Sequence, residues 1–266
     1  MQGRNFKILF IGDVVGRPGR NALKRSLNDI KSRENILFTI ANCENASGGF
    51  GITYSAVDEI FSAGVDFITL GNHTWDKKET ENFIGEVKNL IRPANFSPLS
   101  PGNSFSILEK DGILLGVVSL IGRVFMDNYE NPFIVGEKIV NEMRKKTNNI
   151  IIDFHAEATS EKKALAYYFD GKVSAVFGTH THVQTADECI LRNGTAYITD
   201  VGMTGPYDSI IGNNIEDVLI RFLKGIPRRL EVANKDIRIA YVILTIDAKT
   251  GKAVEIKRYI EKIEGV

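Results

Sequence analysis

Apolar runs of strand length alternate with segments of helical periodicity through the first third of the chain. The runs cover residues 6–11, 36–41 and 65–70, and each ends in a glycine-containing or polar turn. Apolar residues at helical spacing follow each run, at Leu23, Leu27 and Ile30 and then within residues 54–63 and 77–90. Strand, turn and helix units in series favour a parallel sheet that is covered by helices.

The rest of the chain resumes this alternation after an irregular interval. A hairpin signal surrounds Lys110-Asp111-Gly112, and residues 122–132 carry aromatic side chains without a period, which indicates a lid. Further strands are expected at 150–154, 173–177, 188–191, 195–199, 239–246 and 254–259. Helices are expected at 135–146, from an N-cap at Thr159 or Ser160 to residue 169, and at 214–223. We predict one α/β domain over residues 1–266, with a small cap-like excursion around residues 93–133.

Composition limits the partners and the compartment. The 33 basic and 33 acidic residues give a formal net charge of +0, so no global basic field attracts a membrane surface or a nucleic-acid backbone. The two cysteines, Cys43 and Cys189, provide no disulfide framework and suit a reducing compartment. Residues 6–11 are too short for a signal-peptide core or a membrane span. We therefore expect a cytoplasmic protein with no membrane partner and no strong nucleic-acid surface.

Residue types that bind metals stand at the ends of the apolar runs. They are Asp13, Glu44, Asn45, Asn72 and all four histidines, His73, His155, His180 and His182. Because the carboxyl ends of strands in an α/β sheet border one crevice, we expect these side chains to converge there. Oxygen and nitrogen ligands without thiolate suit iron, manganese or zinc, and two ions fit the number of ligands better than one.

The metal interpretation competes with a purely structural one at each position. A single aspartate after a strand, such as Asp13, is commonly a turn or helix-cap residue. His180 and His182 form a stronger signal, because alternate residues of an extended chain point the same way and can place two imidazoles in one site. The occurrence of every histidine at a strand end favours a metal site over scattered structural histidines.

Neighbouring residues have simpler roles as well. Cys43 is expected to be a small buried residue, because no second cysteine lies near it in sequence. Trp75 is expected to pack against the fold, with base stacking as the alternative because it lies close to His73. Arg17 and Arg20 are expected at a solvated helix start, with phosphate binding as the alternative.

The ordered motifs resemble those of a known superfamily. Residues 12–13, 42–45, 71–73, 155–157 and 178–182 are similar to the metal motifs of the calcineurin-like metallophosphoesterases, and the longer segments 12–20, 71–76, 155–162 and 199–206 resemble its YmdB-like branch. The superfamily has Asp-x-His in its first motif and a bridging aspartate. Here Val14 and Val15 follow Asp13, and Glu44 stands at the bridging position. The YmdB-like branch is similar to this sequence in both departures.

The resemblance implies a fold and a complete site. One ion would be held by Asp13, Glu44, Asn45 and His182, and the other by Glu44, Asn72, His155 and His180. Glu44 would bridge the two ions, and His73 would stay free of metal as the general acid. The implied fold is a four-layer α-β-β-α sandwich with two mixed sheets.

The activity implied by the resemblance is hydrolysis of 2′,3′-cyclic nucleotides and related small phosphodiesters by metal-activated hydroxide, linked to RNA turnover or regulation. Two alternatives stay open. The same metal pair serves phosphomonoesterases and protein phosphatases, and a regulatory protein could use the site to bind a nucleotide. The sequence identifies neither the substrate-binding residues nor the resident metal, for which iron or manganese is preferred over zinc, and it is compatible with a homo-oligomer.

Overall fold

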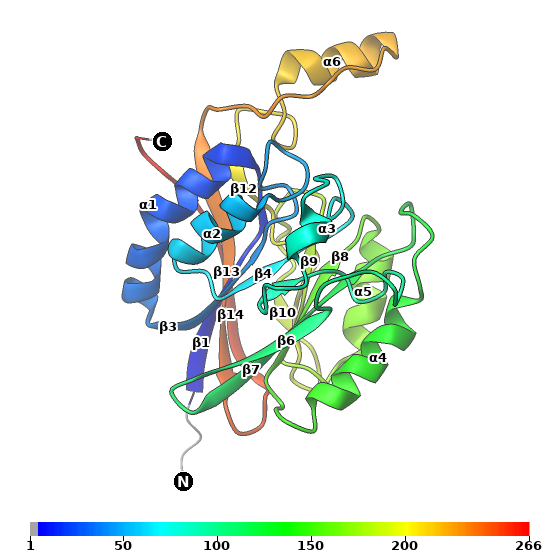
Figure 1. The fold of residues 1–266 in the computed structure, drawn as a ribbon. Helices are drawn as coiled ribbons and strands as arrows, with labels where there is room; N and C mark the ends of the chain where they lie inside the picture. The colour runs from blue at the N-terminus through cyan, green and yellow to red at the C-terminus, as the bar shows by residue number, and fades with distance from the viewer. Residues whose placement is uncertain (1–4, 266) are drawn as a thin grey trace.

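The computed structural model describes residues 5–265, which form two sheets packed face to face with helices outside each sheet (Figure 1). The first sheet has the strand order β2 (Asp13–Val14), β12 (Met203–Pro206), β13 (Ile237–Asp247), β1 (Asn5–Ile11), β3 (Ile36–Asn42), β4 (Phe67–Thr69) and β5 (Leu90–Ile91), and β14 (Ala253–Lys262) pairs with β13. The second has the order β10 (Cys189–Ile190), β11 (Ala196–Ile198), β9 (Ala175–Thr179), β8 (Ile150–His155), β7 (Ile113–Ile121) and β6 (Phe105–Lys110). Each sheet combines parallel and antiparallel pairs, as predicted.

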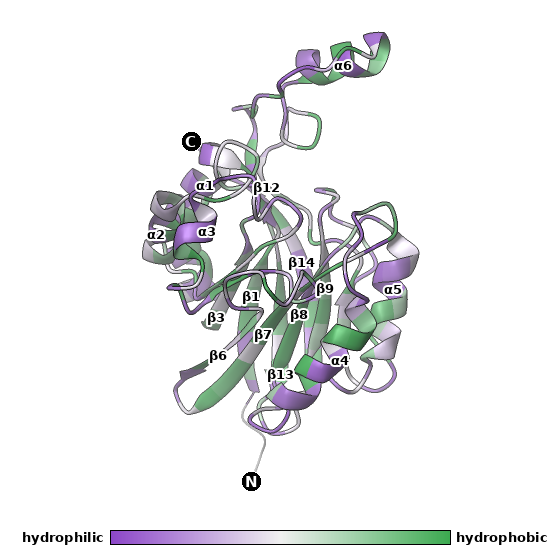
Figure 2. Ribbon diagram, turned by 45° about the vertical axis from the view of Figure 1, so that its right-hand side comes forward, coloured by the Kyte–Doolittle hydropathy of each residue, from purple (hydrophilic) through white to green (hydrophobic). Residues whose placement is uncertain are grey.

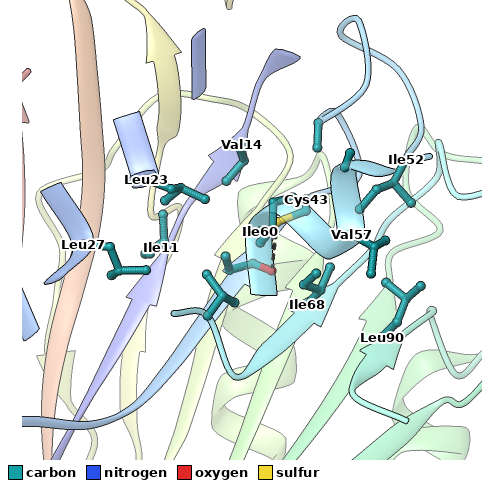
Figure 3. Packing of buried hydrophobic residues seen from close by; sticks show 14 of the residues in the cluster. Ile11, Val14, Leu23, Leu27, Cys43, Ile52, Val57, Ile60, Ile68 and Leu90 are labelled. Carbon is teal, nitrogen blue, oxygen red and sulfur yellow. Dashed lines mark hydrogen bonds between the residues drawn. The ribbon is translucent and has the colours of Figure 1, made fainter. Parts of the chain in front are cut away.

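Alternation along β1 shows how the layers form. Ile8 and Phe10 point into the core between the sheets, where they join Phe177 of β9. Leu9 and Ile11 point the other way, into a core shared with α1 (Gly16–Glu34) and α2 (Tyr54–Ser62), as Figure 3 shows in part. A third core lies between the second sheet and the helices α4 (Pro132–Met143) and α5 (Thr159–Tyr168). This order confirms the four-layer α-β-β-α sandwich.

The strand directions bring the predicted ligands to one edge. β1, β3 and β4 are parallel neighbours in the first sheet, and β7, β8 and β9 are parallel neighbours in the second. Because the sheets pack face to face, the carboxyl ends of both parallel groups border the same crevice.

The structure corrects the helix that was expected over residues 77–90. Helical backbone is confined to α3 (Thr80–Phe83), and it is followed by short turns in which Glu86 N donates to Phe83 O and Leu90 N donates to Val87 O. Residues 90 and 91 then pair with β4 as the edge strand β5. The apolar spacing did predict buried positions correctly, because Phe83 and Ile84 are buried. Sheet pairing nevertheless overrides the helical periodicity at the end of the segment.

Other boundaries also differ from the prediction. The proposed N-cap at Thr159 or Ser160 was wrong, because Thr159 is already helical and the N-cap is Ala158, without a side-chain cap. α4 begins at Pro132 and not at residue 135, since the Asn131 side chain accepts a hydrogen bond from Phe133 N (2.9 Å) and the proline suits the first turn. The strand at 188–191 shortens to β10.

The helix α6 (Ile215–Lys224) stands away from the two-sheet body (Figures 1 and 2). Val218 is its buried residue, whereas Phe222 and Leu223 are each 81% exposed. No helix within residues 5–265 is long and apolar enough to cross a membrane. Of the two free cysteines, Cys43 is buried, as predicted, and Cys189 is exposed.

Candidate metal centre

The predicted ligands lie directly after strands at the shared edge. Asp13 belongs to β2 just beyond β1, Glu44 and Asn45 follow β3, and Asn72 follows β4. His155 ends β8, and His180 and His182 follow β9. Gly71 allows the two sheets to approach, because a Cβ atom there would lie 2.3 Å from His155 Cδ2 and 2.5 Å from Glu44 Oε2. Any other residue at position 71 would push these two side chains apart.

One group of candidate ligands surrounds the Nε2 atom of His155. That atom lies 3.0 Å from Glu44 Oε1, 3.0 Å from Asn72 Oδ1 and 3.0 Å from His180 Nδ1. Ligand atoms of Glu44, His155 and His180 lie within 4.8 Å of one another. Ligands bound at about 2.1 Å to one ion are separated by about 3 Å, so these positions fit a shared cation.

A second group adjoins the first through Glu44. Asn45 Nδ2 lies 3.1 Å from Glu44 Oε1 and 3.1 Å from His182 Nε2. His182 Nε2 in turn lies 3.9 Å from Asp13 Oδ1. If the side-chain amide of Asn45 is flipped, its oxygen takes the place of its nitrogen beside Glu44 and His182. The two groups match the two predicted ligand sets, and Glu44 contacts both.

Asp13 carries an unsatisfied acceptor that a cation would satisfy. The residue is fully buried, and its Oδ2 accepts a hydrogen bond from His180 N (3.1 Å). Within the described part of the chain, its buried Oδ1 has no hydrogen-bond partner. An unpaired buried carboxylate oxygen is costly, so a ligand that supplies positive charge fits this position.

The metal-site histidines each present one ring nitrogen to the cluster and bind an outer partner with the other. The outer contacts are His155 Nδ1 to Thr179 Oγ1 (2.9 Å), His180 Nε2 to Glu157 Oε2 (3.1 Å) and His182 Nδ1 to Ile211 O (2.9 Å). A carboxylate or carbonyl oxygen only accepts, so the outer nitrogens of His180 and His182 carry protons. Their inner nitrogens keep the lone pairs that a metal requires.

A relay gives His155 the same orientation. Thr179 Oγ1 donates its proton to Asp153 Oδ1 (2.8 Å), and it therefore accepts from His155 Nδ1. Asp153 is buried and also accepts hydrogen bonds from Asn42 Nδ2 (2.9 Å) and Thr69 Oγ1. Burial raises the pKa of Asp153, and the positive charge of His155 and these donors oppose that rise. Asp153 thus fixes the orientation of the His155 imidazole through Thr179.

The loop that carries His180 and His182 is held in a strained conformation. Both residues have positive φ angles, 102° and 65°, which are uncommon outside glycine. Between them, Thr181 donates to Asp200 Oδ2 from its backbone N (3.0 Å) and its Oγ1 (2.8 Å). Asp200 forms a buried ion pair with Lys162 Nζ at 2.8 Å. This pair fixes the loop and so the direction of both imidazoles.

The pKa values in the cluster reflect burial and the mutual interaction of Glu44 and His155. Burial acts to raise the pKa of Glu44, but the charge and hydrogen bond of His155 lower it to about 2. Burial acts to lower the pKa of His155, but Glu44 above all raises it to about 9. Burial raises the pKa of Asp13 to about 6 and, together with the charge of His155, lowers that of His180 to about 3. The carboxylates therefore favour a cation among them, and His180 stays neutral as a ligand.

His73 lies beside the cluster without joining it. Its Nδ1 lies 2.9 Å from Asp76 Oδ2, and its ring meets Phe50 edge to face at 5.0 Å. Its backbone N, not its imidazole, contacts the cluster by donating to Glu44 Oε2 (2.9 Å). The side chain is 27% exposed, so solvent or a ligand can reach it.

The two arginines expected at a solvated helix start, with phosphate binding as the alternative, differ in their surroundings. Arg20 donates to Glu59 and to the Ala46 carbonyl. Arg17 is exposed on α1. Arg17 agrees with the expected solvated helix start, whereas Arg20 is partly buried and paired with Glu59.

A hollow opens next to Asn72. Its volume is about 540 Å³, and its wall includes Trp75, Phe96 and Tyr129. The ring of Phe96 lies 6.0 Å from that of Trp75 and 5.2 Å from that of Tyr129. Burial chiefly, with the negative charge of Asp127 next, raises the pKa of Tyr129 to about 12, so its phenol is neutral.

Several supporting residues were missed by sequence reasoning. They are Asp153, Glu157, Lys162, Thr179, Thr181, Asp200 and the carbonyl of Ile211. Asp153 had a usable signal, because it lies two residues before His155 in an otherwise apolar strand. Lys162 had one too, because it occupies the inner face of α5 with Leu165 and Ala166. The Ile211 carbonyl had none, since any residue type supplies one.

The fold and the donor set together define a metallophosphoesterase. The family model described as YmdB-like protein matches residues 9–259, so the chain belongs to the YmdB-like family. The chain is 50% identical over 254 residues to a 2′,3′-cyclic-nucleotide 2′-phosphodiesterase of Bacillus subtilis, covering 96% of each chain.

Solved structures agree with this assignment. A hypothetical protein from Thermus thermophilus superposes with a TM-score of 0.91 at 43% identity, covering 97% of this chain and 99% of that one. A protein described as a novel phosphatase from Mycoplasma pneumoniae gives a TM-score of 0.93 at 34% identity, covering 98% and 95%. The similarity therefore extends over nearly the whole chain.

Proposed function

We propose that this protein is a metal-dependent phosphodiesterase that opens 2′,3′-cyclic nucleotides and related small phosphodiesters. The observation that carries the proposal is the convergence of two ligand groups on Glu44, with the unpaired Oδ1 of Asp13 beside them. The 2′,3′-cyclic-nucleotide 2′-phosphodiesterase named above, with half of its residues identical over nearly the whole chain, supports this substrate class.

The residues divide into two metal sites. Asp13, Glu44, Asn45 and His182 would hold one ion, and Glu44, Asn72, His155 and His180 would hold the other. Two bound transition-metal ions, iron or manganese in preference to zinc, would supply Lewis acidity and a water of lowered pKa. Asp153, Glu157 and Asp200 hold the imidazoles in place through the contacts described above.

His73 completes the reaction as a proton donor. Opening the cyclic phosphate breaks the bond between phosphorus and the ribose 2′ oxygen, and a water oxygen takes its place on phosphorus. The departing oxygen needs a proton, and His73 Nε2 is the ring atom left after Nδ1 binds Asp76. The product is a nucleoside 3′-monophosphate.

A substrate panel tests the proposal. Purified protein with added manganese or iron is assayed on 2′,3′-cyclic AMP, bis-p-nitrophenyl phosphate and p-nitrophenyl phosphate. Turnover of the two diesters, with little of the monoester, is expected. Preference for the monoester would instead identify a phosphomonoesterase or protein phosphatase. Silence with every metal would favour a regulatory nucleotide-binding protein.

The remaining expectations concern location and assembly. Cytoplasmic location stays a prediction from the cysteine content, and the single-domain organisation stays a prediction as well. The sequence is compatible with a homo-oligomer, and we propose α6 as its contact surface, because its exposed apolar residues adjoin acidic residues in its first turn and basic residues in its last turn. An antiparallel pair of such helices would match these charges. Light scattering after size-exclusion chromatography measures the mass directly.

A further inference from the structure

The hollow beside Asn72 connects directly to the metal centre. Asn72 lines the hollow, and its Oδ1 also lies 3.0 Å from His155 Nε2. A volume of about 540 Å³ lies within the usual range of small-molecule sites. A ligand whose phosphate is at the metals would therefore extend its other end into this space.

Three aromatic rings line the hollow, and they differ in their exposure to solvent. Phe96 is 6% exposed and its ring contacts both of the others, whereas Trp75 is 36% exposed and lines the hollow. The hydroxyl of Tyr129 donates to Asp127 Oδ2 at 3.3 Å. Partly exposed rings supported by a buried ring form a stacking surface for another planar group.

The walls are fixed to each other before any ligand binds. Asn95 Nδ2 donates to the carbonyls of Ile121 (2.8 Å) and Glu130 (2.9 Å). Its Oδ1 accepts from Ile121 N (2.8 Å), and Glu130 N donates back to the carbonyl of Asn95 (3.0 Å). The two loops that carry Phe96 and Tyr129 are thus joined, and little ordering cost remains for binding.

The charged residues that line the hollow disfavour an anion as its occupant. Asp127 and Glu130 line it, and the residues that form its wall include no lysine or arginine. A phosphate would meet repulsion here, whereas a neutral planar heterocycle with polar edges would not. The metal centre would have the opposite preference, because bound metal ions would attract the phosphate oxygens.

We propose that this hollow is the nucleobase subsite of the enzyme, in which the base of a nucleotide stacks on Trp75 and Tyr129 while its phosphate lies at the metals. The proposal rests on the proposed phosphodiesterase function, because that function places the phosphate. It assigns a substrate-binding role to Trp75, for which the sequence predicted packing with base stacking as the alternative, and to Tyr129 of the expected lid.

Trp75 is the single tryptophan of the chain, so its fluorescence reports on the hollow directly. Adenosine 3′-monophosphate is titrated into the purified protein, and inorganic phosphate is titrated in parallel. We expect saturable quenching with the nucleotide and none with phosphate. Tyr129→Ala keeps the fluorophore and should weaken nucleotide binding about 5- to 100-fold, the range for loss of one stacking partner. Equal responses to both ligands, or an unchanged Kd in Tyr129→Ala, would overturn the proposal.

A kinetic comparison isolates the base from the reaction. The kcat/KM for 2′,3′-cyclic AMP is divided by that for methyl riboside 2,3-cyclic phosphate, which has the same reacting bond and no base. Trp75→Ala should lower this ratio about 5- to 100-fold, and Trp75→Phe should restore most of it. Tyr167→Ala, which removes an exposed ring on α5 away from the hollow, serves as the control and should leave the ratio unchanged.

The two measurements separate failure of the subsite from failure of the function. If the wild type hydrolyses neither cyclic phosphate but its fluorescence is quenched by the nucleotide alone, the phosphodiesterase assignment is wrong and the base site stands. If both cyclic phosphates are hydrolysed with equal kcat/KM in every variant, the enzyme does not bind the base in this hollow.

Discussion

The metal centre and the aromatic hollow meet at Asn72, yet they are built from different kinds of structure. The ligands sit at the ends of buried strands, and a further layer of hydrogen bonds holds them, as in the relay from His155 through Thr179 to Asp153. The hollow is lined by residues of irregular loops, and the two that carry Phe96 and Tyr129 are joined by hydrogen bonds from the Asn95 side chain to backbone carbonyls. Rigid strands suit chemistry that tolerates little displacement, and loops suit selection among substrates.

Because the two regions are built differently, substitutions in them should have different effects. Changes at the strand ends should remove metal and activity on every substrate together. Changes in the loops should alter which substrate is preferred while the metals remain. The following predictions test that division, beginning with the largest expected effect.

Glu44→Gln should cause the largest loss, because it removes the one anionic ligand that both predicted sites share. We expect about two metal ions per chain in the wild type and reduced occupancy of both sites in the variant. Activity on all diesters should fall by about 10³-fold or more, since charge stabilisation by the ions is worth several kcal/mol. Elemental analysis and kinetics on the same samples measure both quantities. Glu59→Gln, on α2, is the control. A single ion in the wild type would contradict the bridging role of Glu44. Full metal occupancy in Glu44→Gln would contradict it as well.

His73→Gln should separate chemistry from metal binding. The side chain contacts Asp76 and Phe50 and not the cluster, so we expect both metals and most substrate affinity to remain. Hydrolysis of 2′,3′-cyclic nucleotides should slow by about 10²–10⁴-fold, because the ribose oxygen leaves poorly without a proton. The p-nitrophenyl diesters should slow much less, since nitrophenolate needs no acid. Equal deficits for both substrate types, or loss of metal, would remove His73 from the acid role.

The sequence predicted that the candidate ligands meet at one edge because strand ends follow from periodicity, whereas their division into two metal sites rested on the family resemblance. Buried apolar runs are continuous, parallel strands end at one edge, and a polar ligand just after a run has a defined place. The same periodicity predicted a parallel sheet covered by helices, and the resemblance implied the four layers. Periodicity failed at α3 and β5, where four residues of helix and two of strand depend on tertiary contacts that local spacing does not encode.

The hollow could not be predicted in this way. Trp75, Phe96 and Tyr129 belong to three loops, and no period relates their positions. Their meeting depends on the hydrogen bonds that Asn95 makes to Ile121 and Glu130. Asp200 and Lys162 illustrate an intermediate case, because a lysine on the inner face of a helix signals a buried partner without identifying it.

Asp200→Asn should have a moderate effect on metal affinity through the loop of His180 and His182. The carboxylate holds Thr181 at two atoms and neutralises Lys162, which is fully buried. We expect metal affinity to fall about 10- to 100-fold, the usual cost of losing a supporting contact. Leaving Lys162 unpaired should also lower the free energy of unfolding by about 3–5 kcal/mol. Calorimetric metal titration and denaturant unfolding measure these effects.

A double variant keeps this prediction testable if the single variant is unstable. Lys162→Met with Asp200→Asn removes both buried charges, so most of the lost stability should return. Metal affinity should stay low, because the carboxylate that held Thr181 is still missing. Full recovery of metal affinity in the double variant would show that Asp200 only compensates the lysine and does not orient the loop.

The smallest and most selective effect is expected from the loop that closes the hollow. Residues 122–132 carry Phe125, which is 86% exposed, and Tyr129, whose ring contacts Phe96. Replacing Phe125 to Tyr129 by two glycines should change the relative rates for different cyclic nucleotides by about tenfold, because a wall of the hollow is lost. Metal content should stay at the wild-type value, since no predicted ligand lies in this segment. A uniform fall across all substrates with loss of metal would show instead that the loop supports the strand ends, and the division between the two regions would fail.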